Sequence, residues 1–339
     1  MIPTDLPADL PSFLARFGSD LQCREYLFKA RWPQGFICAR CGHASAYAHK
    51  QRLIDECTSC GKQHSLLAGT IFEQTKTGLA RWFLAIFLVT SSKRGLSAAE
   101  LKRQMGFGSD QTAWSWLHKI RRAMVRPERE PLAAPAQADE TYLGAPKSGK
   151  RGRGAGGKVL VAGAVECRDV TVTDKRTGKP KIVRQLGRIR LAVVAAASAE
   201  SLQGFVNATI ARPGTITTDG AKAYRGLGQN GDQSDSGTGF EHDAVNLSRT
   251  GAEGLKRMSA IHLVFGHLQR WLLGTHHAGQ SRKHLPSYLD EFAFRFNRRR
   301  AKSISHRFAR LIEIAVKTAP KTYWQIVGRK APNLKLVEG

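Results

Sequence analysis

The sequence predicts an α/β protein whose mixed-sheet core is preceded by a small zinc-binding module and a helical domain. Three observations lead to this fold class. Residues 158–167 and 188–196 have the composition of β-strands, and a helical stretch and a short strand (215–219) follow them. Two CxxC pairs stand nearer the N-terminus, and residues 79–124 between these regions have the spacing of amphipathic helices. Strands and helices in this order favour a mixed sheet covered by helices.

The charge of the chain predicts a polyanionic partner. Its 339 residues include 53 Lys and Arg against 27 Asp and Glu, which leaves a net charge of +26. Nucleic acid is the commonest partner that relieves such self-repulsion, and an anionic membrane is the rival. The longest apolar run, around Trp82–Val89, is too short to span a bilayer, and the N-terminus does not resemble a secretion signal. We therefore expect a cytoplasmic protein that associates with the nucleoid and not with membranes.

Five segments follow one another along the chain. We expect an N-terminal helical segment (1–34), a zinc ribbon (35–78), a helix-turn-helix-like domain (79–130), an α/β domain (131–300) and a basic C-terminal tail (301–339). Prolines between the helical and strand-rich regions mark the boundary between the third and fourth segments.

The two CxxC pairs predict a structural zinc site. Cys38 and Cys41 form the first pair, and Cys57 and Cys60 form the second. Zn²⁺ prefers four soft ligands in a tetrahedron, and two such pairs on neighbouring hairpins supply them. A glycine directly after each pair suits the tight turn that is needed there. Because four protein ligands leave no open coordination position, we expect the zinc to be structural.

Residues 95–124 resemble a helix-turn-helix. A Gly-Phe-Gly turn at 106–108 separates a short helix, which Ser97 caps, from a longer one. The longer helix carries polar and basic side chains that could reach DNA bases and phosphates: Gln111, Thr112, Lys119, Arg121 and Arg122. The alternative is an ordinary helical pair with a solvated basic face. The overall charge favours DNA contact.

A second basic segment lies between the first two strands of the α/β domain. It is rich in glycine and contains Lys150, Arg151 and Arg153. We expect a flexible loop that follows a phosphate backbone, with a merely solvated loop as the alternative.

Two aspartates at strand ends predict the chemistry. Asp139 opens the segment DETYLG at the first strand of the α/β region, and Asp219 ends the strand TITTD. Carboxylates on neighbouring strands can converge on divalent cations, which catalyse phosphodiester chemistry in pairs about 3.5–4 Å apart. Mg²⁺ prefers such oxygen ligands. An isolated aspartate at a strand end is more often a turn residue, but the cysteines, the charge and the order of elements together favour a magnesium site.

Several segments, taken in order, resemble bacterial insertion-sequence transposases with an N-terminal zinc ribbon. These segments are the ribbon itself, AGTIF, DETYLG, KRGRGAGGK, TTDGAKAY, RWLLGTHH and YLDEFAFRFNRR. The resemblance covers roughly residues 20–300 and implies the RNase H-like catalytic core of the DDE superfamily. It implies DNA cleavage at element ends and strand transfer with Mg²⁺ or Mn²⁺. Asp139 and Asp219 match the first two catalytic carboxylates of that family.

The resemblance also implies the partners and a third ligand. Double-stranded DNA, as terminal inverted repeats and target, would be bound by a homo-oligomer. The third ligand of the family, Glu or often Asn or His, stands two turns before a Lys on a helix. Here His262 precedes Gln269 by seven residues, and such positions share one helix face. We expect His262 to complete the catalytic site, with His267 as the competing candidate, and Gln269 and Arg270 to contact DNA.

The remaining expectations concern the segment YLDEFAFRFNRR and Gln269, which stands where the family has a Lys. We expect Glu291 to pack within the protein, and Arg298 and Arg299 to contact the DNA backbone. Gln269 in place of the family's Lys favours a rival interpretation, a catalytically inactive, transposase-derived regulator that binds DNA. A structure-selective nuclease with the same core is a third possibility.

Overall fold

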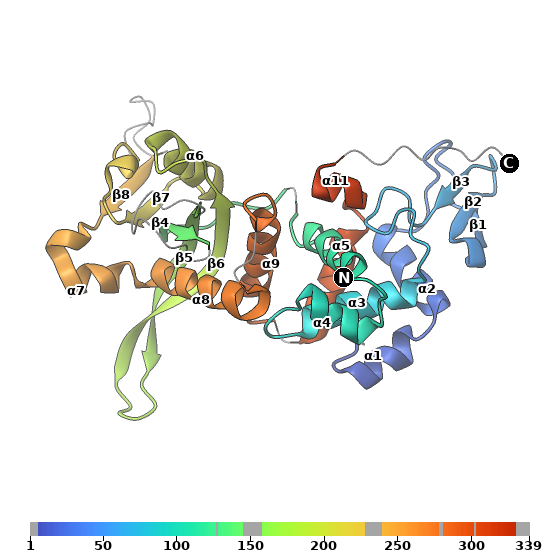
Figure 1. The fold of residues 1–339 in the computed structure, drawn as a ribbon, viewed down its shortest axis with the longest axis horizontal. Helices are drawn as coiled ribbons and strands as arrows, with labels where there is room; N and C mark the ends of the chain where they lie inside the picture. The colour runs from blue at the N-terminus through green and yellow to red at the C-terminus, as the bar shows by residue number, and fades with distance from the viewer. Residues whose placement is uncertain are drawn as a thin grey trace. The chain divides into compact units, whose positions relative to one another are not determined.

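The computed structural model describes residues 6–126, 128–144, 158–227, 239–277, 281–301 and 303–329. The chain forms two compact units (Figure 1): Met1–Arg126 with Arg300–Gly339, and Pro127–Arg299. Among the described residues, no helix combines the length and the apolar character needed to cross a membrane.

The first unit consists of helices and a small three-stranded sheet. Its helices are α1 (Leu10–Phe17), α2 (Asp20–Arg31), α3 (Leu79–Ser91), α4 (Ala98–Met105), α5 (Asp110–Arg122), α10 (Ile304–Ala315) and α11 (Tyr323–Val327). The antiparallel strands β1 (Ala46–His49), β2 (Ile54–Cys57) and β3 (Gln63–Ser65) form the ribbon, with the short helix η1 (Lys50–Arg52) between the first two. The helices predicted within residues 79–124 are therefore present.

The core of the first unit is a cluster of aromatic rings from distant parts of the chain. Phe13 of α1 stacks on Phe87 of α3 with the ring centroids 4.3 Å apart. Phe308 of α10 lies 5.5 Å from Phe13 and 5.7 Å from Phe83. Residues 301–339, expected as a basic tail, thus contain an amphipathic helix whose apolar face is buried in the N-terminal unit. Its apolar residues bury more surface there than they could in a solvated tail.

The second unit contains a five-stranded mixed sheet. In chain order its strands are β4 (Ala136–Leu143), β5 (Val159–Thr173), β6 (Pro180–Val193), β7 (Gly214–Thr218) and β8 (Phe240–Ala244). Their spatial order is β6-β5-β4-β7-β8, with antiparallel pairing from β6 to β4 and parallel pairing from β4 to β8. This mixed sheet confirms the predicted fold class and is consistent with an RNase H-like core.

Helices cover both faces of this sheet. One face packs against α8 (Ser259–His276) and α9 (Leu285–Asn297), and the other packs against α6 (Ala199–Thr209) and the short helix η2 (Lys222–Tyr224). Helix α7 (Leu247–Arg257) precedes α8. One face of β4 therefore faces α8, and the opposite face of β4 faces α6.

Three elements of this unit depend on contacts that the local sequence does not show. Strand β8 was not expected, because its Glu-His-Asp sequence forms a strand only through backbone pairing to β7. Residues 220–227 contain the short helix η2 but no longer helix. Helices α7 and α8 are divided at Met258, where a side chain from the sheet interrupts the helical stretch.

A glycine on β5 determines how closely α8 approaches the sheet. Gly163 pairs with Asp139 on β4, and a Cβ atom at position 163 would lie 2.6 Å from a ring carbon of Phe265 on α8. Real carbon atoms do not approach so closely, so any larger residue would push α8 away. Phe265 is buried, and so are its neighbours Ile261 and Leu268 on the same helix.

We therefore expect Gly163→Ala to lower the free energy of unfolding by about 1–3 kcal/mol, the usual cost of overpacking a core. Gly274→Ala on α8 is the matched control, because a Cβ atom there meets nothing within 4 Å. The control should be neutral or stabilise by up to about 1 kcal/mol, since Ala favours helix over Gly. Urea denaturation of both variants makes the comparison, and equal midpoints would contradict the close approach of α8.

Candidate active site and zinc centre

The four cysteines of the ribbon form one cluster. Their sulfur atoms all lie within 4.8 Å of one another, with 3.7 Å between Cys38 and Cys60 and 3.6 Å between Cys41 and Cys57. A tetrahedral zinc ion with Zn–S distances of about 2.3 Å requires sulfur atoms about 3.8 Å apart. The cluster therefore has the dimensions of a closed, structural zinc site.

The backbone around each CxxC pair is folded in the same way. Gly42 donates its N–H to the Cys38 carbonyl at 2.9 Å, and Gly61 donates to the Cys57 carbonyl at 3.0 Å. Both glycines have positive φ angles, 74° and 67°, which confirms the turns predicted after the cysteines. His64 Nε2 lies 3.3 Å from Cys38 Sγ, so its imidazole contacts a ligand sulfur and is not a fifth ligand.

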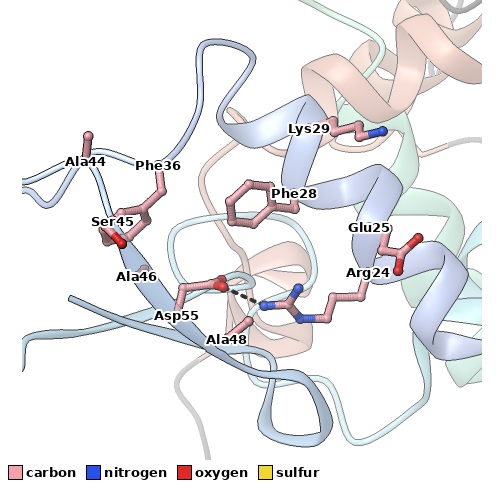
Figure 2. Close-up of a pocket in the computed structure, with 10 residues that line it drawn as sticks. All are labelled: Arg24, Glu25, Phe28, Lys29, Phe36, Ala44, Ser45, Ala46, Ala48 and Asp55. Carbon is pink, nitrogen blue, oxygen red and sulfur yellow. Dashed lines mark hydrogen bonds and ion pairs between the residues drawn. The ribbon is translucent and has the colours of Figure 1, made fainter. Parts of the chain in front are cut away.

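A buried ion pair joins the ribbon to helix α2. Arg24 Nη2 of α2 lies 2.5 Å from Asp55 Oδ1 of β2, and both side chains are almost fully buried. The pair lies at a cleft of about 530 Å³ between α2 and the ribbon (Figure 2). Phe28 of α2 and Phe36 of the ribbon segment also line this cleft.

Strands β4 and β7 bring the two predicted aspartates together. The parallel register aligns Ala136 with Ile216 and Gln137 with Thr217. Asp139 on β4 and Asp219, the residue directly after β7, each lie two residues beyond the second aligned pair. Asp139 is 9% exposed and accepts the Glu140 N–H at 2.8 Å. Asp219 accepts the Ala221 N–H at 2.9 Å, in the turn that follows β7. Both carboxylates therefore have one oxygen fixed by the backbone.

Helix α8 adds an imidazole to this pair. His262 Nε2 lies 3.2 Å from Asp139 Oδ2, with the two side chains 33% and 12% exposed. The hydrogen bond to Asp139 raises the pKa of His262, and the charge of Asp219 acts in the same direction. His267, the competing candidate, is exposed and contacts Arg270 at 3.3 Å. The structure thus brings His262, and not His267, to Asp139.

His262 and Gln269 share one face of α8, as their spacing of seven residues predicts. Gln269 Nε2 contacts Thr141 Oγ1 on β4 at 3.4 Å, two residues beyond Asp139. Gln269 and Arg270 are both exposed, and Arg270 Nε donates to the Gly266 carbonyl at 3.2 Å. The face that contains His262 and Gln269 therefore follows β4.

The position of α8 depends on Gln137, a residue that sequence reasoning missed. Its side-chain oxygen accepts the Ile261 N–H at 3.1 Å, and its side-chain nitrogen donates to the Arg257 carbonyl. In an uninterrupted helix, Ile261 would donate directly to Arg257. The buried amide of Gln137 takes the place of this hydrogen bond, and a side chain inserted in this way breaks or kinks a helix. It therefore starts α8 at a fixed point relative to β4.

Two other strands hold the same junction. The Arg257 carbonyl also accepts from Arg184 Nη1 of β6 at 3.0 Å. The Arg257 guanidinium lies 2.5 Å from Asp243 on β8, and Thr217 Oγ1 of β7 lies 3.3 Å from the same carboxylate. The junction between α7 and α8 is thus bound directly to β6 and β8, and through Asp243 to β7, the strand that precedes Asp219.

A buried tyrosine links the two aspartate segments on the opposite face of the sheet. Tyr224 of η2 is 1% exposed and donates its hydroxyl to Glu140 Oε2 at 2.9 Å. Burial, together with the nearby carboxylates, raises the pKa of Tyr224, so the hydroxyl stays protonated and donates. This hydrogen bond holds the segment that follows Asp219 against Glu140, the neighbour of Asp139.

The two carboxylates offer the oxygen ligands that hard divalent cations prefer, but the spacing of the three side chains is wider than that of the cysteine cluster. Asp139, Asp219 and His262, all described residues, do not place one ligand atom each within 4.8 Å of the other two. The three side chains therefore do not form a compact single-ion site like that of the cysteines.

The predicted DNA-contacting residues of α5 divide into two groups. Gln111 and Thr112 are exposed at the start of the helix. Arg121 is 1% exposed, which corrects the expectation that it reaches a phosphate. Arg122 donates to the Ala319 carbonyl at 3.1 Å, and burial lowers the pKa of Lys119. The basic end of α5 faces the protein because the chain after α10 packs against it, which the local sequence does not reveal.

The basic residues after α9 make contacts within the second unit. Arg299 donates to the carbonyls of Gly187 and Leu186 at the edge of β6 and stays exposed, so its contact with the DNA backbone stays a prediction. The Arg298 guanidinium lies 4.1 Å from the Phe294 ring centroid. Glu291 is fully buried and forms an ion pair with Arg295 at 2.7 Å, consistent with the predicted packing role. Lys150, Arg151 and Arg153 lie outside the described residues.

Comparisons with known proteins relate two segments of the chain to transposase domains. Residues 131–297, which include both aspartates and His262, match the ISXO2-like transposase domain. Residues 18–63, which include the four cysteines, match the transposase zinc-ribbon domain. The chain is 27% identical over 295 residues to an uncharacterized protein in transposable element ISH50 of Halobacterium salinarum, covering 82% of this chain and 91% of that protein. No solved structure matches the chain.

Metal content and ribbon folding test the zinc centre. We expect one zinc ion per chain by elemental analysis, and loss of that zinc in Cys38→Ser and in Cys57→Ser. Because structural zinc contributes about 10–16 kcal/mol of apparent binding free energy, its loss should unfold the ribbon. Cys23→Ser, a buried cysteine outside the cluster, is the control that should keep its zinc. A ribbon that stays folded without metal would contradict the assignment.

A substitution of Gln137 tests whether its inserted amide holds α8. Gln137→Leu keeps the volume but removes both hydrogen bonds, and we expect it to lower the free energy of unfolding by about 1–3 kcal/mol. Gln269→Leu makes the same change at an exposed position and should cost far less. Urea denaturation compares the two. If both variants unfold at the same urea concentration, Gln137 does not hold α8.

Proposed function

The chain combines the transposase zinc-ribbon domain with the ISXO2-like transposase domain of insertion-sequence transposases, and from this premise we propose that it cuts DNA at the ends of such an element and joins the ends to target DNA. The reaction would use Mg²⁺ or Mn²⁺. The observation that carries the proposal is the contact of His262 on α8 with Asp139 on β4, beside the neighbouring strand that leads to Asp219.

The residues of the site have distinct roles in this proposal. Asp139 and Asp219 supply anionic oxygens, and His262 supplies a neutral nitrogen beside them. The cations would activate the attacking water or 3′-hydroxyl and stabilise the leaving oxygen. The backbone holds one oxygen of each aspartate, and the other oxygen of Asp139 contacts His262. The sheet thereby fixes the carboxylates before substrate binds, which is the arrangement that electrostatic catalysis needs.

We assign recognition of the element ends to the first unit. Gln111 and Thr112 at the exposed start of α5 are positioned to read bases, since N-terminal residues of a recognition helix contact base edges. Gln269 and Arg270 are exposed beside the active site and would contact the DNA that is cut. Lys150, Arg151 and Arg153 would follow its backbone. We propose that a homo-oligomer holds the two element ends during strand transfer.

The rival function is a DNA-binding regulator without catalysis. Gln269 favours it, because a cation at that position of the helix would offset the charge of a DNA phosphate and glutamine does not. Asp139 and Asp219 favour catalysis, since a chain that only binds DNA does not need two convergent carboxylates.

Strand cleavage by active-site variants tests the proposal. We expect purified protein to cleave DNA that carries the sequences flanking its reading frame, with Mg²⁺ or Mn²⁺ and not without them. Asp139→Ala and Asp219→Ala should each abolish cleavage while DNA binding persists, because each removes charge that holds the cations. His262→Ala should lower cleavage strongly, and His262→Glu should retain or raise it at low Mg²⁺.

His267→Ala is the matched control on the same helix and should have a much milder effect than His262→Ala. Equal activity of wild type and Asp139→Ala would overturn the assignment of the site. DNA binding by the wild type with no cleavage under any metal condition would instead support the regulator.

A further inference from the structure

Strands β5 and β6 continue beyond the sheet as a two-stranded hairpin. A register shift between Val165 and Cys167 marks the point at which the hairpin leaves the sheet. From Cys167 paired with Leu186 to Thr173 paired with Pro180 the strands stay in register, and at 3.3 Å per residue they extend about 20 Å. Figure 1 shows this hairpin extending away from the other strands. We call residues 167–186 the arm.

Both faces of the arm are exposed. On one face Val172 is 40% exposed and Val183 is 39% exposed, and on the other Ile182 is 71% exposed. A solvated strand pair without a core on either side is marginally stable in water. The arm therefore has no role in packing the second unit over most of its length.

The arm is strongly basic. It contains six cations, Arg168, Lys175, Arg176, Lys179, Lys181 and Arg184, against Asp169 and Asp174. Arg184 forms a bidentate ion pair with Asp169, with distances of 2.8 and 2.9 Å. Asp174 accepts backbone N–H groups of the turn, including Arg176 N at 2.8 Å, so its carboxylate holds the turn. The other five cations extend into solvent, three of them in or beside the turn.

We propose that the arm binds duplex DNA by entering its major groove. A two-stranded β-ribbon fits this groove, which is about 12 Å wide, and the cations at the turn and edges would contact phosphates on both sides. The exposed valines and Ile182 would meet apolar base edges, such as thymine methyl groups, instead of water. This inference rests on the proposed function. It gives the DNA that is cut a contact surface on the unit that carries Asp139 and Asp219.

A second copy of the chain is the other partner that such a hairpin could take, by pairing strand edges. The charge favours DNA, because two arms of net charge +4, from six cations and two aspartates, would repel one another. Duplex DNA, which offers a phosphate about every 1.7 Å of helix axis, would instead neutralise these cations.

The salt dependence of DNA binding tests this proposal. The variant combines Lys175→Ala, Arg176→Ala and Lys179→Ala, all exposed positions of the turn. We expect the log–log slope of affinity against salt to become shallower by about 0.9 per lost phosphate contact, or by about 2.7 for three. The control combines Arg249→Ala, Lys256→Ala and Arg282→Ala, which removes the same charge from exposed positions of the same unit outside the arm. The control should leave the slope nearly unchanged.

Equal slopes for the arm variant and the control would overturn the proposal, because the effect would then reflect total charge alone. Replacing residues 170–183 by a two-residue turn gives a second measurement. A change in oligomeric state on sedimentation, with an unchanged slope, would show that the arm binds another chain and would also overturn it. Failure of the wild type to bind or cut DNA would count against the proposed function, whereas normal cleavage with unchanged slopes would count against the arm alone.

Discussion

The contact between helix α8 and strand β4 is the constraint on which the candidate active site depends. His262 comes within 3.2 Å of Asp139 only because α8 lies close to the sheet and begins at a fixed residue. Gly163 allows the close approach, since a Cβ atom there would meet the Phe265 ring. Gln137 sets the start of the helix by replacing one of its backbone hydrogen bonds. Gly163 and Gln137 thus set how close α8 lies to the sheet and at which residue the helix begins, although neither needs to touch a cation or DNA.

The same arrangement explains why carboxylates can stand close together here. Two neighbouring negative charges destabilise a fold unless cations or hydrogen-bond donors offset them. Each aspartate accepts a backbone N–H, and His262 beside Asp139 supplies a donor whose pKa is raised by that contact. The sheet itself is braced on its other face, where Tyr224 donates to Glu140. The structure therefore holds the carboxylates in place through neutral or cationic partners that a divalent cation could replace.

Most of the fold and the central residues of the site could be predicted from the sequence. The cysteine spacing, the strand ends at Asp139 and Asp219 and the helical spacing of His262 are local patterns, and the structure brings those residues together. What the sequence could not show depends on distant contacts. Gln137 looks like an ordinary strand residue until α8 packs on it, and Arg121 looks like a DNA contact although it is buried. The apolar face of helix α10 is buried because aromatic residues of α1 and α3, distant in the sequence, pack against it.

The central claim is that His262 and the two aspartates hold divalent cations in one site. Pulsed electron paramagnetic resonance of bound Mn²⁺ tests it most directly, because an imidazole nitrogen that coordinates the ion modulates the echo signal. The account predicts nitrogen modulation in the wild type and in His267→Ala, its loss in His262→Ala, and loss of Mn²⁺ binding at this site in Asp139→Ala. Nitrogen modulation that survives in His262→Ala but disappears in His267→Ala would contradict the account.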